Sequence, residues 1–62
     1  MISELDRVKI IKTGITGTVV DIFDRKGNRV YAVESDDPFP PEKGYGKKWP
    51  IFDCLENDLI RL

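Results

Sequence analysis

The stretch that decides the fold is DRVKIIKTGITGTVVDIF, residues 6–23. Val8 and Ile10 alternate with charged residues, which is the period-two pattern of a strand with one buried face. Gly14 and Gly17 then interrupt this pattern, and glycine permits both positive φ angles and a close approach of two backbones. The stretch therefore predicts two β-strands, residues 6–12 and 18–24, joined by a tight turn that contains both glycines.

The rest of the chain continues as short extended segments. The polar sequence DRKGN at residues 24–28 predicts a hairpin loop, and a third strand rich in β-branched and aromatic residues follows at 29–34. Residues 35–48 hold several prolines and glycines and predict a long loop, of a length that is usually functional or mobile. We expect a fourth strand at 49–54, where Pro50 indicates an edge strand or a strand start, then a helical turn at 55–58 and a closing strand at 59–62. The predicted fold class is all-β with about five strands.

Length and composition limit what the chain can be. Sixty-two residues predict a single domain, residues 1–62, which buries roughly 60% of the surface that its unfolded chain exposes. The net charge of −1 supplies no general attraction for phosphate backbones or anionic membranes. The single cysteine, Cys54, precludes an internal disulfide and indicates a reducing compartment. No basic, apolar leader and no stretch of about 20 apolar residues is present, so we expect a cytoplasmic protein that does not span a membrane.

The chain lacks the residues on which most enzymes depend. It contains no histidine, so the commonest general base and zinc ligand are missing, and neither Ser3, Ser35 nor Cys54 has an imidazole to activate it. Asp36 and Asp37, beside Glu34, form the one tight acidic cluster, which we interpret as a solvated loop in preference to a weak cation site. We therefore expect a protein that is not an enzyme and that binds no metal or cofactor.

Three motifs carry a resemblance to known small barrels. The sequence GITGTV at residues 14–19 is similar to the glycine-x-x-glycine-x-valine core of the KOW motif, which occurs in ribosomal proteins and transcription elongation factors. The sequences YAVE at 31–34 and LENDL at 55–59 resemble small uncharacterised bacterial proteins with a similar beginning. The resemblance implies an SH3-like barrel, in which these motifs form turns and core positions and do not bind a ligand. The chain departs from a KOW module in its acidic second half, and it lacks the aromatic signatures of the peptide-binding groove of signalling SH3 domains.

The aromatic residues suggest a surface for a protein partner. Phe23, Tyr31 and Phe52 lie in predicted strands, and we expect them in the core. Three other rings lie in or beside the long loop, where they either fold back over the open end of the barrel or stay exposed and bind a partner. We favour a non-enzymatic binding or regulatory module that contacts a protein through the 35–49 loop, with these candidate residues: Phe39, Tyr45, Trp49, Asp36, Asp37, Lys47 and Lys48.

The alternative is a KOW-type module that binds nucleic acid or the ribosome. The basic residues outnumber the acidic ones in the first half of the chain, and five of them could converge on one end of the barrel and contact phosphates. A solvated face is the more ordinary interpretation of such residues. The candidates for this alternative are Lys9, Lys12, Arg25, Lys26 and Arg29.

Overall fold

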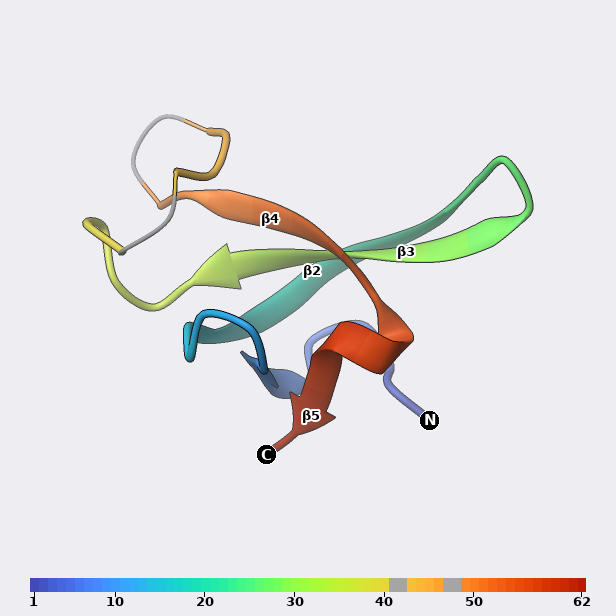
Figure 1. Cartoon of the computed structure of the whole chain (residues 1–62), viewed down its shortest axis with the longest axis horizontal. Coiled ribbons are helices and arrows are strands. Elements are labelled where there is room, and N and C mark those ends of the chain that lie inside the picture. The colour runs from blue at the N-terminus through green and yellow to red at the C-terminus, as the bar shows by residue number, and fades with distance from the viewer. Residues whose placement is uncertain (41–42, 47–48) are drawn as a thin grey trace.

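The chain forms one five-stranded antiparallel sheet with the strand order β4-β3-β2-β1-β5 (Figure 1). The computed structural model describes residues 1–40, 43–46 and 49–62. The elements are β1 (Arg7–Ile10), β2 (Thr16–Arg25), β3 (Asn28–Ser35), β4 (Ile51–Leu55), the short 3-10 helix η1 (Glu56–Asp58) and β5 (Leu59–Arg61). The expected all-β class, the five strands and the helical turn before the last strand are confirmed. In the described part of the chain no helix is long and apolar enough to cross a bilayer.

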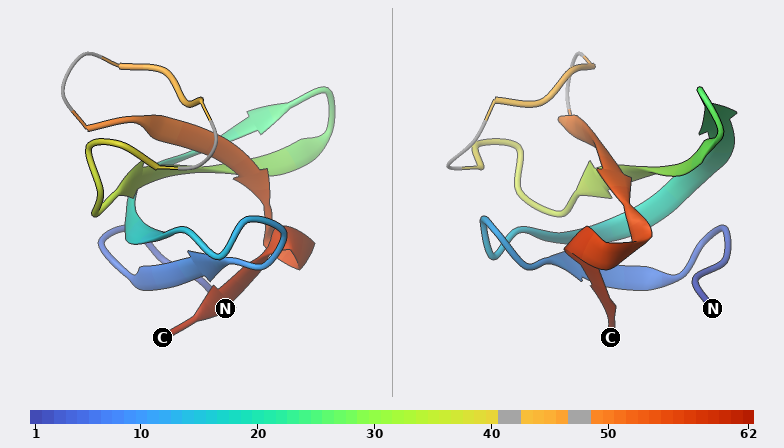
Figure 2. Two further views of the ribbon diagram at one scale, coloured as in Figure 1. Left: turned by 60° about the vertical axis from the view of Figure 1, so that its left-hand side comes forward. Right: turned by 45° about the vertical axis from the view of Figure 1, so that its right-hand side comes forward.

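The sheet is strongly curved but open. β4 and β5 are its two outer strands, and within the described ranges they do not pair with each other. Figure 2 shows β4 and β1 on opposite sides of the curved sheet, with the chain crossing from β4 through η1 to β5. The expected closure into a barrel is therefore not confirmed.

The core fills the concave side of this sheet. Val8, Val19, Tyr31 and Val33 are fully buried there. The Tyr31 hydroxyl lies at the edge of the core and donates a hydrogen bond to Glu56 Oε1 at 3.2 Å, so the buried ring keeps a polar partner. The core position expected for Tyr31 is confirmed.

A β-bulge in β2 corrects the expected position of Phe23. The register between β2 and β3 shifts between Val19 and Asp21, so Ile22 packs against the core. In a regular strand, residues 19, 21 and 23 would share one face, but the extra residue of a bulge reverses the faces that follow it. Phe23 consequently lies on the convex side, where it is half-buried.

The convex side carries a small apolar cluster of its own. Phe23 pairs with Val30, which in turn pairs with Leu55, and Val30 is almost completely buried although it is not part of the main core. The guanidinium of Arg25 lies over the Phe23 ring, 5.2 Å from its centroid. The interior strand β3 is thus covered on both faces, which suits its β-branched and small residues.

The two glycines of the deciding stretch have different roles. Gly14 lies in the turn after β1 with a φ of +77°, a conformation that glycine adopts without strain. Gly17 was expected in the same turn but lies inside β2, which begins at Thr16. A Cβ atom at Gly17 would collide with the Glu34 carbonyl oxygen and lie 2.9 Å from its carbonyl carbon. Close backbone approach, and not positive φ, is the reason for glycine at position 17.

Gly17→Ala tests this close approach. We expect the substitution to lower the free energy of unfolding by about 1–3 kcal/mol, because the backbone of β3 must move to admit the methyl group. Urea denaturation measures the loss. Gly14→Asn is the matched control: nothing lies within 4 Å of a Cβ there, and asparagine tolerates a positive φ. An equal loss in both variants would show that Gly17 is not sterically restricted.

Cys54 supplies a second test, this time of the core. Its thiol is buried beside Phe52, and burial, with the nearby Asp58 and Asp53 carboxylates, raises its pKa to about 11. Since the thiolate is the reactive form, a rise of about two units lowers the reactive fraction at pH 8 by about 100-fold. Iodoacetamide should therefore label the native protein slowly and the urea-unfolded protein fast, with a native rate that keeps increasing up to about pH 11. Fast native labelling that levels off near pH 9 would contradict this placement.

Candidate functional site

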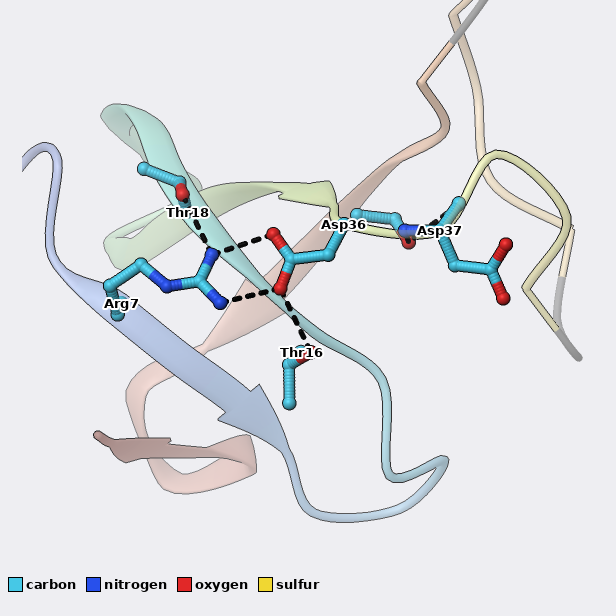
Figure 3. Close-up of polar contacts among 6 residues, drawn as sticks. Arg7, Thr16, Thr18, Asp36 and Asp37 are labelled. Atoms are coloured by element: carbon cyan, nitrogen blue, oxygen red, sulfur yellow. Dashed lines mark hydrogen bonds and ion pairs between the residues drawn. The ribbon is translucent and has the colours of Figure 1, made fainter.

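The loop after β3 begins at an ion pair that links it to the first two strands. Both guanidinium nitrogens of Arg7 donate to the Asp36 carboxylate, at 2.6 and 2.5 Å, and the Thr16 hydroxyl donates to the same carboxylate at 2.9 Å (Figure 3). The Asp36 N–H also donates to the Thr16 carbonyl oxygen at 3.0 Å. The Arg7 guanidinium holds the pKa of Asp36 below its usual value. Both side chains are solvent-exposed, so the pair contributes little to the stability of the fold, but it positions the start of the loop.

Asp37 has a local role in the turn that follows. Its main-chain N–H donates to the Ser35 hydroxyl oxygen at 3.0 Å, and its carboxylate accepts from the Phe39 N–H at 2.8 Å. Figure 3 shows the Asp37 carboxylate pointing away from Arg7. The two neighbouring acids, Asp36 and Asp37, are therefore both engaged within the fold, in opposite directions.

The loop returns to the sheet at Tyr45. Tyr45 and Ile51 exchange two main-chain hydrogen bonds, of 2.9 and 2.6 Å, along the outer edge of β4. The Tyr45 hydroxyl donates to one oxygen of Asp53 at 2.6 Å, and Arg25 donates to the other at 3.1 Å. The hydrogen bond to Asp53 raises the pKa of Tyr45 to about 12. This second attachment joins the loop to β4 and, through Arg25, to β2.

The three aromatic rings of the loop are exposed to solvent to different degrees. Phe39 is 88% exposed, Tyr45 50% and Trp49 39%, and none of the three belongs to the core. Of the two arrangements that the sequence left open, the structure therefore has the exposed one at all three positions. We call these three residues the aromatic loop surface. Lys47 and Lys48, predicted beside them, lie outside the described residues.

The candidate acidic residues do not form a cation site. Asp36 is occupied by Arg7 and Thr16, and Asp37 by the main chain of its own turn. Among the residues that the structure describes, no group of three acidic or cysteine side chains could hold a metal ion. Their placement indicates that Asp36 and Asp37 shape the loop.

The basic candidates do not gather at one end. Lys9 pairs with Thr16 at the start of β2, and Lys12 lies in the turn just before that strand. Arg25, Lys26 and Arg29 lie around the hairpin at the other end of β2, ten residues or about 30 Å of strand away. In Figure 1 the hairpin and the turn before β2 lie at opposite sides of the view. The nucleic-acid alternative supposes that these cations converge on one end, whereas the two groups lie near different ends of β2.

Two residues of the site were not singled out from the sequence. Arg7 and Asp53 hold the two ends of the loop, yet each looks like an ordinary charged residue on the exposed face of a strand. Arg7 meets Asp36, 29 residues away, and Asp53 meets Tyr45, 8 residues away, as well as Arg25, 28 residues away. Alternation predicts that such side chains face outward, but it contains no information on which distant residue they meet.

The Tyr45 hydroxyl provides a direct test of the second attachment. A raised tyrosine pKa contributes stability that is complete below pH 10 and is lost as the pH rises through 12, because the unfolded tyrosine ionises near 10. Ultraviolet titration of tyrosinate, taken as the difference between wild type and Tyr45→Phe, should show ionisation near pH 12. Asp53→Ala should move this ionisation toward pH 10. A wild-type Tyr45 that already titrates near 10 would contradict the hydrogen bond to Asp53.

Comparison with other proteins adds no relative. No protein-family model, no curated protein and no solved structure matches the chain. The case for a function therefore depends on the geometry of the loop and of the sheet edge beside it.

Proposed function

We propose that this protein is a non-enzymatic binding module that contacts a protein partner through the aromatic loop surface. The observation that carries the proposal is the exposure of Phe39, Tyr45 and Trp49 on one loop of a chain whose core is otherwise small. Large aromatic side chains dominate the binding energy of protein interfaces, and exposed groups of them are uncommon on monomers without a partner. The proposal assigns no catalytic residue, metal or cofactor to the chain.

The anchoring of the loop supports this role. The loop is attached at Asp36 by Arg7 and at Tyr45 by Ile51 and Asp53. A loop held at both ends loses less conformational entropy on binding than a free segment, so more of the interaction energy appears as affinity. The ion pair and the tyrosine hydrogen bond thus serve binding by positioning the rings.

The fold that we propose for this module is an SH3-like barrel. Five antiparallel strands, strong curvature and a 3-10 turn before the last strand support the proposal. The KOW-like sequence GITGTV provides the turn and the close approach of Gly17 to β3, which are structural roles. Nucleic-acid binding is the weaker candidate, because the five basic candidates are divided between two ends of β2 and Arg25 is paired with Asp53.

A capture experiment with matched variants tests the proposed function. The immobilised protein should retain a specific partner from a cell extract, and Phe39→Ala with Trp49→Ala should lose that partner while the circular dichroism spectrum stays unchanged. The matched control removes two exposed apolar side chains elsewhere, Ile11→Ala with Leu62→Ala, and should retain the partner. Capture should change little between low and moderate salt, because the burial of apolar rings is not a charge effect.

The same protein is titrated with labelled single-stranded RNA and duplex DNA. Micromolar binding that weakens steeply with salt, and that is lost when Lys9, Lys12 and Arg25 are changed to glutamate, would favour the nucleic-acid alternative. Equal partner capture by the loop variant and its control would exclude the aromatic loop surface as the contact.

A further inference from the structure

The outer edge of β4 is only partly covered. Main-chain groups of successive residues in an edge strand face alternately toward the neighbouring strand and away from it. The Pro50 carbonyl accepts from Ser35 in β3, whereas Ile51 bonds outward to Tyr45. By this alternation the main-chain groups of Asp53 and Leu55 also face outward. The Leu55 N–H donates to the Asp58 carboxylate at 3.3 Å. In the described part of the chain, the main-chain N–H and carbonyl of Asp53 face the free edge with no partner.

Tyr45 shows that this edge accepts an extended residue. Its two main-chain hydrogen bonds to Ile51 form a single antiparallel bridge, and the loop does not continue the ladder to Asp53. An extended segment that pairs with an exposed sheet edge gains main-chain hydrogen bonds, and pockets beside the edge then select its alternate side chains. The single bridge at Ile51 leaves Asp53, the next residue of β4 whose main chain faces outward, without a ladder partner among the described residues.

Open cavities flank this edge on both sides. On the core side, a cavity of about 350 Å³ has Ile10, Phe52 and Cys54 in its lining together with Lys12 and Lys43. On the convex side, a cavity of about 280 Å³ is lined by residues that include Val30, Leu55, Arg25 and Lys26. A third cavity, of about 380 Å³, continues along β4 to Tyr45. Asp53 lines all three, so the cavities lie around one stretch of the edge of β4, and we refer to them together as the β4 groove.

The basic side chains that line the β4 groove outnumber the acidic ones. The acidic side chains in its lining are Asp53 and Asp58, and both already accept hydrogen bonds, Asp53 from Arg25 and Tyr45 and Asp58 from the main chain. Two basic side chains line the core-side cavity and two line the cavity on the convex side, and among the described residues only one of these four has an ion-pair partner. These four are Lys12, Lys43, Arg25 and Lys26.

We propose that the β4 groove binds an extended acidic segment of the protein partner, which adds to β4 as a further strand beside Tyr45. The segment pairs its main chain with Asp53, places acidic side chains near Lys12 and Lys43, and places apolar side chains over Phe52 and its neighbours. This inference rests on the proposed function, and it identifies the chemistry of the partner where the function names only a protein. The aromatic loop surface contacts the same partner at the Tyr45 end of the groove.

Peptide binding tests the charge of the occupant. The probe is a fluorescein-labelled peptide of about ten residues in which glutamate alternates with valine, and its comparison is the same peptide with lysine in place of glutamate. By fluorescence anisotropy at low salt, the glutamate peptide should bind at least about tenfold more tightly than the lysine peptide. Equal affinities, or a preference for the lysine peptide, would overturn the proposal.

Matched protein variants locate the binding. Lys12→Glu with Lys43→Glu should weaken binding of the glutamate peptide about tenfold or more. Lys9→Glu with Arg29→Glu makes the same change in net charge at residues that do not line the β4 groove, and should leave affinity within about twofold. Both variants are checked for folding by circular dichroism. Equal losses in the two would mean that general charge attraction, and not the β4 groove, holds the peptide.

Methylation of the peptide main chain tests the pairing with β4 without altering the protein. One peptide carries N-methyl groups on its valines and an isomer carries them on its glutamates, so each removes the donors from one edge of the extended peptide. One isomer should bind like the parent and the other should lose binding, because only one edge can face Asp53. Identical affinities of the two isomers would rule out strand addition.

The peptide and capture experiments distinguish a failure of the groove inference from a failure of the proposed function. If the aromatic variant loses its partner but the glutamate peptide does not bind, the β4 groove inference is wrong and the proposed function stands. If the peptide binds as expected but the aromatic variant keeps its partner, the groove inference holds and the role of the aromatic loop surface is wrong.

Discussion

The bulge in β2 is the local constraint on which the arrangement of this protein depends. One extra residue between Val19 and Asp21 reverses the faces of the second half of the strand. Ile22 enters the core in place of Phe23, and Phe23 moves to the convex side over Val30. The reversal also brings Arg25 to that side, where it lies over the Phe23 ring and reaches Asp53 on β4.

The contacts of the loop follow from this reversal. Asp53 accepts from Arg25 with one oxygen and from the Tyr45 hydroxyl with the other, so the bulge, the hairpin and the loop are connected through a single carboxylate. The other end of the loop is held by Arg7 and Asp36. Each of these polar contacts is weak because it is solvent-exposed, yet each fixes the orientation of the side chains that it joins. The stability of the fold comes mainly from the apolar core, and the polar contacts determine where the aromatic rings are presented.

The loop also lies beside the open edge of the sheet. In a closed barrel both edges of β4 would be paired, whereas here, among the described residues, its outer edge is bridged only at Ile51 and capped near Leu55. Natural proteins protect such edges because an uncovered strand invites pairing with another chain. In the binding mode that we propose, the charged side chains beside this edge restrict pairing to a complementary segment, and the aromatic rings add apolar contact area.

Local pattern in the sequence determined much of the architecture. Alternation at Val8 and Ile10, the polar hairpin before residue 29 and the change of pattern after residue 54 predicted the five strands and the helical turn, because strand and turn preferences act within a few residues. The concentration of aromatic rings in the long loop was equally visible. The exposure of these rings could not be predicted, because a small core has space for some rings and the sequence does not state which rings it buries.

Tertiary structure decided everything that depends on distant residues. The bulge placed Phe23 outside the core, although simple alternation would put it on the same face as Val19. The backbone of Glu34, seventeen residues along the chain, explains Gly17, and partners 29 and 28 residues away occupy Arg7 and Asp53. The five basic candidates of the first half of the chain lie in two groups because the length of β2 keeps its two ends apart. Sequence periodicity assigns a side chain to a face, and the register and curvature of the folded sheet determine which side chains meet on that face.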